Sequence, residues 1–318
     1  MSSAVQLAEP LTPEWFDRRR QGIGASEIAA VMGFSPWESP FSLYWRKVNG
    51  WEFEASPEME WGNRLEDAIA AKYEANHPEY NVHPLGLVSH PLRSWHLATP
   101  DRVLCDHQMH DNPFPGDPTF QWSHYDQNIL GVLELKTAHS ADGWGEPGTA
   151  EVPVHYRAQV LWQMSAVGVN FADLAVLIGG SDYREYTVRL DTADLNVMIE
   201  HGRRFMARIA DGDPPPIDDH AATLATVKRL HPDLDDAEVE VDARIANHYR
   251  RACEMDRKAG ALKKRYEALL RAEMGRARKA TCAGQFVASR SVYEVAEHTV
   301  KAHTVDRLNP PRTKKEPS

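Results

Sequence analysis

Apolar and polar residues alternate along the first 212 residues in two rhythms that predict different elements. Short apolar runs rich in β-branched and aromatic residues predict strands, whereas apolar residues three or four positions apart predict helices. The expected strands are 81–89, 95–104, 129–136, 174–178 and 183–190, and a helix is expected over 154–167. This order predicts an α/β (α+β) domain over residues 1–212, in which helices flank a central mixed, mostly antiparallel sheet.

Capping residues predict three further helices in the N-terminal part of this domain. Ser26 is expected to cap a short helix that ends at Gly33, and Ser39 is expected to cap a second helix that ends at Gly50. A third helix is expected to begin near Pro57, because proline is favoured at the first helical position. Helices therefore precede most of the expected strands.

The sequence changes character after residue 212. Three consecutive prolines cannot continue the preceding helix, so residues 213–241 are expected to be a linker. Residues 242–300 are expected to form a basic helical accessory region, with a long charged helix over 242–279. The polar residues 301–318 are expected to be a disordered tail. The chain is thus predicted to be one large domain with a C-terminal helical extension.

The composition excludes several classes of protein. With 318 residues, of which 42% are hydrophobic, the chain is long enough for one large core and an appendage. No apolar stretch approaches the length of a membrane span, and the N-terminus lacks the regions of a signal peptide. The 3 cysteines are scattered, which is not typical of a disulfide framework. We therefore expect a cytoplasmic protein with no membrane partner.

The net charge of −10 is unevenly distributed. Residues 242–279 contain twelve Lys or Arg and five Asp or Glu, a local charge of +7 that leaves −17 for the rest of the chain. A protein that binds nucleic acid needs Lys and Arg to contact the phosphates. The acidic remainder therefore argues against broad coating of DNA, but it allows a narrow basic channel around an acidic metal site.

Two carboxylates and a lysine form the most informative pattern: Asp101, then Glu134 and Lys136 in the sequence VLELKT. Alternate side chains of a strand share a face, so Glu134 and Lys136 point one way while Leu133 and Leu135 point to the other, buried side. With an aspartate from a neighbouring strand, they supply the oxygen ligands and the amine of metal-assisted phosphodiester cleavage. The alternative is a solvated strand face that carries an acid and a lysine.

Further candidate ligands lie on the expected helices. Glu66 follows Pro57 at a helical spacing that would bring a third carboxylate toward the strands, although a glutamate on a helix is most often solvent-exposed. Arg19 and Ser26 precede a helix N-terminus, a combination that binds phosphate, or else they are a surface arginine and a helix cap. Tyr156 and Gln159 share a polar face of the helix over 154–167, which makes both candidate DNA contacts.

Residues 106–127 are expected to form a long irregular loop between the two strands of the candidate site, as a lid or a DNA-contacting loop. Cys105, His107, His110 and His124 lie in or beside this loop. Their spacing matches no closed zinc module, so a zinc site is not expected.

Five sequence motifs resemble, in this order, those of the YqaJ-like viral recombinase nucleases, relatives of phage lambda exonuclease within the PD-(D/E)xK superfamily. The motifs are GIGASEIAAVMGFSPWESPFSLYWRKVNG, MEWGNRLEDAIAAKYE, LATPDRVL, VLELKT and VPVHYRAQVLWQM, and the resemblance covers residues 14–190. It implies a PD-(D/E)xK nuclease core in which Glu66, Asp101 and Glu134 are metal-binding acids and Lys136 is the catalytic lysine. It also implies Mg²⁺, replaceable by Mn²⁺, with two ions per site.

The resemblance implies a substrate and partners as well. Arg19, Ser26, Thr99 and Gln159 fall on positions that hold the terminal or scissile phosphate of DNA. The implied reaction is 5′-to-3′ degradation of one strand of linear duplex DNA, which leaves a 3′ single strand for a partner annealing protein in the host cytoplasm. Lambda exonuclease is a ring trimer, so a homo-oligomer is implied. The long loop 106–127 and the C-terminal extension depart from the family pattern.

Two other functions fit the same residues. A structure-specific or single-strand endonuclease would use the same fold and chemistry, because cleavage polarity depends on how the pocket closes. A non-catalytic DNA-binding recombination scaffold would use the basic helix over 242–279 instead. A binding module has no need for three acids that converge, which favours the enzyme.

Overall fold

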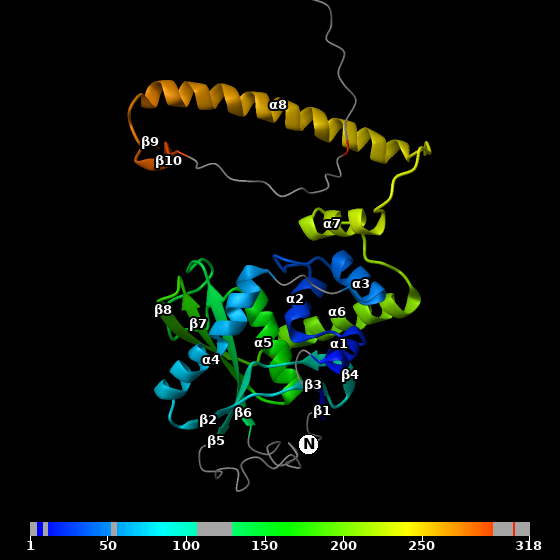
Figure 1. The fold of residues 1–318 in the computed structure, drawn as a ribbon, viewed down its shortest axis with the longest axis vertical. Helices are drawn as coiled ribbons and strands as arrows, with labels where there is room; N and C mark the ends of the chain where they lie inside the picture. The colour runs from blue at the N-terminus through cyan, green and yellow to red at the C-terminus, as the bar shows by residue number, and fades with distance from the viewer. Residues whose placement is uncertain (1–4, 9–11, 52–55, 107–128, 295–307, 309–318) are drawn as a thin grey trace, which may run out of the picture. The chain divides into compact units, whose positions relative to one another are not determined.

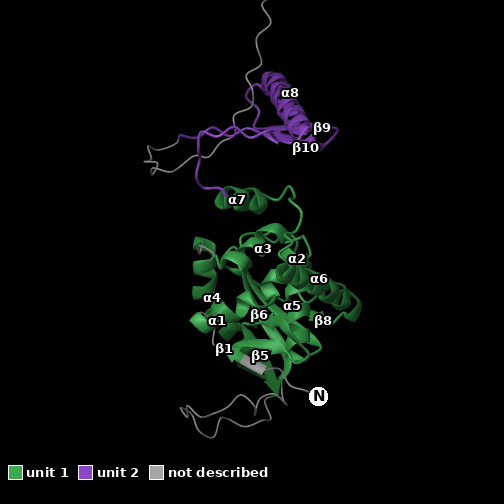
Figure 2. Ribbon diagram, turned by 90° about the vertical axis from the view of Figure 1, so that its right-hand side faces the viewer, with its two compact units in different colours: residues 1–230 green, residues 231–318 purple. Residues whose placement is uncertain are grey.

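The computed structural model describes residues 5–8, 12–51, 56–106, 129–294 and 308 of the chain. The chain divides into two compact units, residues 1–230 and residues 231–318 (Figure 2). All candidate site residues lie in the first unit. Among the described helices, none is both long enough and apolar enough to cross a membrane.

A five-stranded sheet forms the centre of the first unit (Figure 1). Its strands, in spatial order, are β2 (Tyr80–His83), β5 (Arg102–Asp106), β6 (Ile129–Ala138), β7 (Phe171–Ile178) and β8 (Asp182–Arg189). β6 and β7 are parallel, with α5 (Val154–Val167) between them in sequence, whereas the other three pairs are antiparallel. The mixed, mostly antiparallel sheet confirms the predicted fold class, and α5 has the predicted bounds.

Helices cover both faces of this sheet, because its central strands carry apolar side chains on both sides. α5 packs on one face, where it shares the larger core cluster with Val132 of β6. α4 (Pro57–Asn76) packs on the other face, where Tyr73 shares a second cluster with Leu133 and Leu135. Successive residues of β6 therefore turn alternately toward α5 and toward α4.

Two predicted strands are each divided in the structure. Residues 81–89 and 95–104 were each expected to be one strand, but Pro84 and Pro100 interrupt them, since proline has no N–H to donate to a sheet. The segments separated in this way, β3 (Leu87–His90) and β4 (Arg93–Ala98), form a three-stranded sheet with β1 (Val5–Ala8). The break at Pro100 leaves Asp101 at the entrance of β5, outside the strand.

The N-terminal helices are α1 (Pro13–Arg20), the 3-10 helix η1 (Ala25–Glu27), α2 (Ile28–Val31) and α3 (Pro40–Asn49). α3 begins and ends as predicted, with the Ser39 hydroxyl as N-cap and Gly50 in the left-handed region at φ 63°. The predicted cap at Ser26 is wrong, because Ser26 lies inside η1. The carboxylate of Glu27 closes this turn instead by accepting the N–H of Gly24 at 2.7 Å.

Two more helices complete the first unit, α6 (Thr192–Asp211) and α7 (Ala221–Leu230). α6 ends at Gly212, just before the triple proline. α7 was not predicted, since it lies in the segment 213–241 that was expected to be a linker. The Thr223 hydroxyl hydrogen bonds with that of Ser39 at 2.6 Å, which attaches α7 to α3. The first unit therefore extends to residue 230 rather than 212.

The second unit comprises α8 (Ala243–Met274) and a hairpin of β9 (Lys279–Cys282) and β10 (Gln285–Ser289). Every residue of α8 is at least partly exposed. Because seven residues are close to two helical turns, basic residues seven apart lie in rows that wind slowly around the helix. Two neighbouring rows form what we call the basic ridge: Arg244, Arg251, Lys258 and Arg265, and Arg250, Arg257, Lys264 and Arg271. The predicted disordered tail, residues 301–318, lies outside the described residues except for Leu308.

A buried histidine gives the first unit a testable pH dependence. His96 in β4 is fully buried, and its Nε2 donates to the carbonyl oxygen of Trp162 at 2.9 Å. Burial lowers the pKa of His96 to about 3. Between pH 3 and 6.5 the unfolded chain therefore binds a proton that the folded chain does not, so stability falls as the pH falls. We expect His96 to remove about 2 kcal/mol of unfolding free energy between pH 7 and pH 5.

Urea unfolding of the wild type and of His96→Gln at both pH values measures this contribution. Glutamine keeps an N–H donor for the carbonyl of Trp162 but does not titrate. The variant should lose about 2 kcal/mol less than the wild type on acidification. The same pH dependence in both proteins would contradict the assignment of a neutral, buried His96.

Candidate active site

Strand β6 carries the predicted acid and lysine on one face. Leu133 and Leu135 pack in the cluster with α4, whereas Glu134 and Lys136 lie on the opposite face, where α5 contacts Glu134. Asp101 accepts the backbone N–H of Leu135 at 2.8 Å, so its carboxylate lies beside the residue that separates Glu134 from Lys136. We call Asp101, Glu134 and Lys136 the acid–lysine site. The predicted alternation along this strand is confirmed.

Glu134 is buried and engaged at both of its oxygens. Its side chain is 1% exposed, and Oε1 accepts hydrogen bonds from Lys136 and Gln159. Oε2 accepts from Gln163 Nε2 at 2.7 Å. Gln159 and Gln163 are one turn apart on α5, so their amides reach the same carboxylate. The ring of Tyr156, one turn earlier, lies 5.3 Å from Lys136 Nζ. α5 therefore holds both charged side chains of the strand.

The acid–lysine site concentrates negative charge in a buried place. Burial raises the pKa of Glu134, and the charge of Asp101 adds to the shift, so that this pKa reaches about 7 although Lys136 opposes it. Burial would lower the pKa of Lys136, but the two carboxylates raise it above its ordinary value. Lys136 therefore stays protonated at neutral pH, whereas Glu134 takes up a proton more readily than an ordinary glutamate.

The third predicted metal ligand, Glu66, is held by an arginine that sequence reasoning overlooked. Arg102 donates to Glu66 Oε1 and to Asp67 Oδ1, each at 2.7 Å. Burial and the charge of Asp101 raise the pKa of Glu66, which indicates that these two acids interact. Within the described residues, however, no group of three or more His, Cys, Asp or Glu side chains is gathered closely enough to hold a metal ion. Asp101 thus interacts with Glu66 and with Glu134, but the three carboxylates do not converge.

Three of the predicted phosphate ligands lie in one neighbourhood. Arg19 Nη2 donates to Ser26 Oγ at 3.1 Å, and the guanidinium lies 4.5 Å from the ring centroid of Trp15. Trp15 Nε1 donates to Thr99 Oγ1 at 3.1 Å, so Trp15 contacts both Thr99 and Arg19. We call Arg19, Ser26 and Thr99 the candidate phosphate site. Gln159, the fourth predicted ligand, bonds to the acid–lysine site instead.

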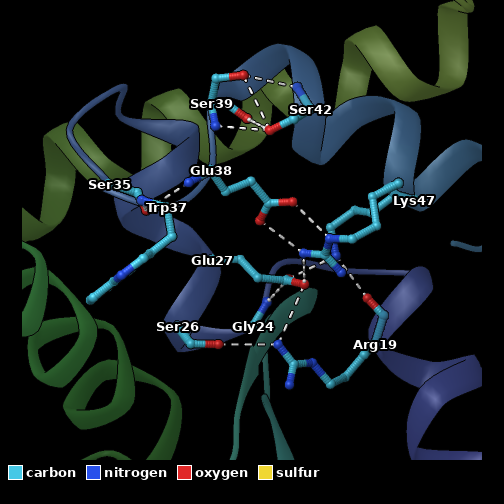
Figure 3. Close-up of polar contacts among 11 residues, drawn as sticks. Arg19, Gly24, Ser26, Glu27, Ser35, Trp37, Glu38, Ser39, Ser42 and Lys47 are labelled. Atoms are coloured by element: carbon cyan, nitrogen blue, oxygen red, sulfur yellow. Dashed lines mark hydrogen bonds and ion pairs between the residues drawn. The ribbon is translucent and has the colours of Figure 1, made fainter. Parts of the chain in front are cut away.

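A buried ionic cluster contacts Arg19 through Glu27 (Figure 3). Glu27 is 3% exposed and accepts from Arg46 Nη2 at 2.8 Å and from Lys47 Nζ at 2.7 Å. Arg46 Nε also donates to Glu38 Oε1 at 2.7 Å. Sequence reasoning missed these residues because the partners are 19 and 20 positions from Glu27. The glutamate three positions after Gly24, at capping-box spacing, was the one local signal.

The predicted loop between the site strands lies outside the described residues, apart from Asp106. The same is true of His107, His110 and His124. Cys105 is buried in β5, where burial raises the pKa of its thiol to about 11. β5 and β6, which the loop joins, pair as antiparallel neighbours.

The fold and the acid–lysine site together define the class: the first unit has the mixed sheet, flanking helices and D…E-x-K residues of a PD-(D/E)xK nuclease core. Residues 14–170 match the sequence profile of the YqaJ-like viral recombinase domain. The resemblance to the YqaJ-like viral recombinase family is therefore confirmed over residues 14–170. Family and site together support a nuclease.

Several known proteins are similar to this chain. Protein YqaJ of Bacillus subtilis (strain 168) is 23% identical over 244 residues, which cover 74% of this chain and 68% of that protein. The alkaline exonuclease LHK-Exo of Laribacter hongkongensis is 19% identical, with 70% of this chain and 100% of that chain covered and a TM-score of 0.46. A putative exonuclease of Eubacterium rectale is 12% identical, with 74% and 97% covered and a TM-score of 0.42.

Proposed function

We propose that this chain is a metal-dependent DNA exonuclease that degrades linear duplex DNA from its 5′ ends and leaves 3′ single strands for annealing. The observation that carries the proposal is the buried Glu134 paired with Lys136 on one strand face beside Asp101. Two carboxylates and an ammonium group in one largely buried place are costly unless they are paired or bind a metal, and Asp101 has no cation of its own among the described contacts of this site. The match of residues 14–170 to a viral recombinase domain supports the DNA substrate and the role in recombination.

The side chains of the acid–lysine site have distinct roles in this proposal. Lys136, which stays protonated, orients the attacking water and donates to an oxygen of the scissile phosphate. Gln159 and Gln163 fix the carboxylate of Glu134 by donating to it. The Arg19 guanidinium and the Ser26 and Thr99 hydroxyls bind the terminal phosphate, and Tyr156 is placed beside Lys136 as a further DNA contact.

The donor chemistry of the site fits a divalent metal. Asp101 and Glu134 offer carboxylate oxygens, the ligands that Mg²⁺ prefers. Burial and then the charge of Asp101 raise the pKa of Glu134, and a bound cation would oppose both effects. Glu66 fits as a further ligand once its carboxylate leaves Arg102. The chemistry that one or two bound Mg²⁺ or Mn²⁺ ions supply is neutralisation of the scissile phosphate and activation of water. A ring of three subunits and a single-strand annealing partner stay predictions of the family resemblance.

The second unit is proposed to add DNA affinity. The basic ridge extends from Arg244 to Arg271, which is about 40 Å along α8 at 1.5 Å per residue. Its regular positive charge fits the phosphate backbone of a duplex, whereas the rest of the chain is acidic. This unit is accessory because the candidate catalytic residues all belong to the first unit.

One assay separates the candidate functions. Linear duplex DNA labelled at one end, with 5′-phosphate or 5′-hydroxyl ends, is incubated beside nicked and covalently closed circles, with Mg²⁺ and with EDTA. We expect loss of the 5′-terminal strand from linear DNA, no cleavage of closed circles, and no activity with EDTA. Cleavage of closed circles would identify an endonuclease, and binding without any cleavage would identify a scaffold.

A further inference from the structure

The guanidinium of Arg19 is held from several sides at once (Figure 3). It lies over the ring of Trp15 at 4.5 Å and donates to Ser26 Oγ at 3.1 Å, and its Nη2 lies 3.4 Å from Glu27 Oε1. It also packs against the backbone of Gly24, where a Cβ would lie 3.0 Å from Nη2. The Arg19 side chain remains 22% exposed, so its free edge faces solvent at the candidate phosphate site.

Glu27 and Lys47 connect this guanidinium to the backbone that carries it. Lys47 Nζ donates to Glu27 Oε2 at 2.7 Å and to the carbonyl oxygen of Arg19 at 2.9 Å. Glu27 also accepts the N–H of Gly24 at 2.7 Å. The buried carboxylate of Glu27 therefore contacts the guanidinium of Arg19 and the turn at Gly24 directly. Through Lys47 it is also connected to the main chain of Arg19. A long arginine side chain that is fixed in this way has little rotamer freedom left to lose when it binds an anion.

Burial lowers the pKa of Lys47, whereas its contact with Glu27 favours the protonated form; with Lys47 protonated, the cluster has one more positive than negative charge. Glu27 and Glu38 are its acids, and Arg19, Arg46 and Lys47 are its cations. Burial would raise the pKa of Glu27, but Lys47, Arg19 and Arg46 together lower it far below its ordinary range, so Glu27 is charged. Arg46 is shared between both acids. Among the three cations, Arg19 has the longest contact with Glu27, 3.4 Å compared with 2.8 Å for Arg46 and 2.7 Å for Lys47. An anion beside Arg19 would balance the cluster.

We infer that Glu27, Lys47 and Gly24 are positioning residues that hold the Arg19 guanidinium at the phosphate of a DNA end. This inference rests on the proposed function and deepens it. None of the three residues needs to touch DNA. They favour phosphorylated ends because they hold Arg19 in the geometry that a terminal phosphate requires. The charge-assisted hydrogen bonds from this fixed arginine are therefore stronger than those that a mobile arginine would make.

Two variants displace Arg19 by different means. Glu27→Gln removes the carboxylate that binds Arg19, while Gly24→Ala keeps every charge and pushes a methyl group against the guanidinium. Gly24 has φ −72°, so alanine fits its backbone. Glu38→Gln is the matched control, because Glu38 binds Arg46 but not Arg19. Arg19→Ala is the reference for complete loss of the guanidinium.

The readout is kcat/KM on 5′-phosphate ends divided by kcat/KM on 5′-hydroxyl ends, measured in full-length protein with Mg²⁺. We expect Glu27→Gln and Gly24→Ala to lower this ratio at least about tenfold, mainly through KM on phosphorylated ends, and Glu38→Gln to keep it. For Glu27→Gln, the direction of the change in this ratio distinguishes a positioning role from a purely electrostatic one. Removing a negative charge would strengthen phosphate binding if Glu27 acted only through its field, whereas loss of positioning weakens it.

The outcomes separate this inference from the proposed function. A wild type with no preference for phosphorylated ends, or a preference that survives Arg19→Ala, contradicts the candidate phosphate site itself. A preference that Arg19→Ala removes but that both Glu27→Gln and Gly24→Ala retain overturns the positioning role alone. An equal loss in Glu38→Gln overturns it as well, because general loosening of the cluster would then explain the effect. Gly24→Ala decides the question if Glu27→Gln does not fold.

Discussion

Glu134→Gln and Lys136→Ala should each lower DNA cleavage by at least about 10³-fold while the protein stays folded. Glu134 is buried and accepts hydrogen bonds from Lys136, Gln159 and Gln163. A neutral amide at this position removes the negative charge that a metal requires, and loss of Lys136 removes the ammonium that orients water. Either loss withdraws transition-state stabilisation of several kcal/mol, which corresponds to this fall in rate. Single-turnover cleavage of end-labelled duplex measures it directly.

Asp173→Asn is the matched control for these variants. Asp173 is a buried acid on β7, it lies opposite Leu133 in the register, and it bonds to Thr187 Oγ1 at 2.6 Å. It therefore reports what neutralising a buried carboxylate of the sheet does to folding without touching the acid–lysine site. A folded Glu134→Gln protein that cleaves DNA as fast as Asp173→Asn would remove Glu134 from the active site.

The acid–lysine site was predictable because it depends on short-range geometry. The period of two along β6 fixes which side chains share a face, and the apolar flanks of Glu134 indicate a buried strand, so the sequence alone brings Glu134 and Lys136 together. α5 was predicted with its observed bounds because it ends at Gly168, which adopts the left-handed conformation that terminates a helix. Elements with a clear local signal were therefore predicted correctly.

The parts that were missed depend on contacts between distant residues. Nothing local in the sequence tells that Arg102 binds Glu66, which is 36 positions away, or that Trp15 donates to Thr99, which is 84 positions away. The short helix α7 was missed because its 10 residues are too few to form a stable helix alone, and its packing on α3 joins residues far apart in the sequence. By contrast, the strand breaks at Pro84 and Pro100 have a local signal, because proline cannot donate a hydrogen bond within a sheet.

A chain that ends at Leu230 should keep metal-dependent cleavage at low salt but lose most of its salt-sensitive affinity for DNA. The new end point follows from α7, which packs on the first unit through Thr223, so a cut at residue 213 would remove part of the folded unit. The missing second unit carries the basic ridge. If four of its residues contact phosphates, the slope of log K against log salt should become shallower by about 3 to 4, since each contact contributes about 0.9.

The full-length variant with Arg250, Arg257, Lys264 and Arg271 all changed to Gln tests the ridge without removing the unit, and it should show the same shallower slope. A matched control changes Arg203 and Arg204 of α6 to Gln, because these exposed arginines pair with Glu200 on the first unit.

The exposed Ile245, Met255, Leu262 and Tyr266 give α8 an apolar stripe, so sedimentation must accompany the binding assay. A truncated chain that binds DNA with an unchanged slope but no longer self-associates would show that α8 pairs subunits. An unfolded truncated chain would show that the first unit depends on the second and that the boundary is wrong.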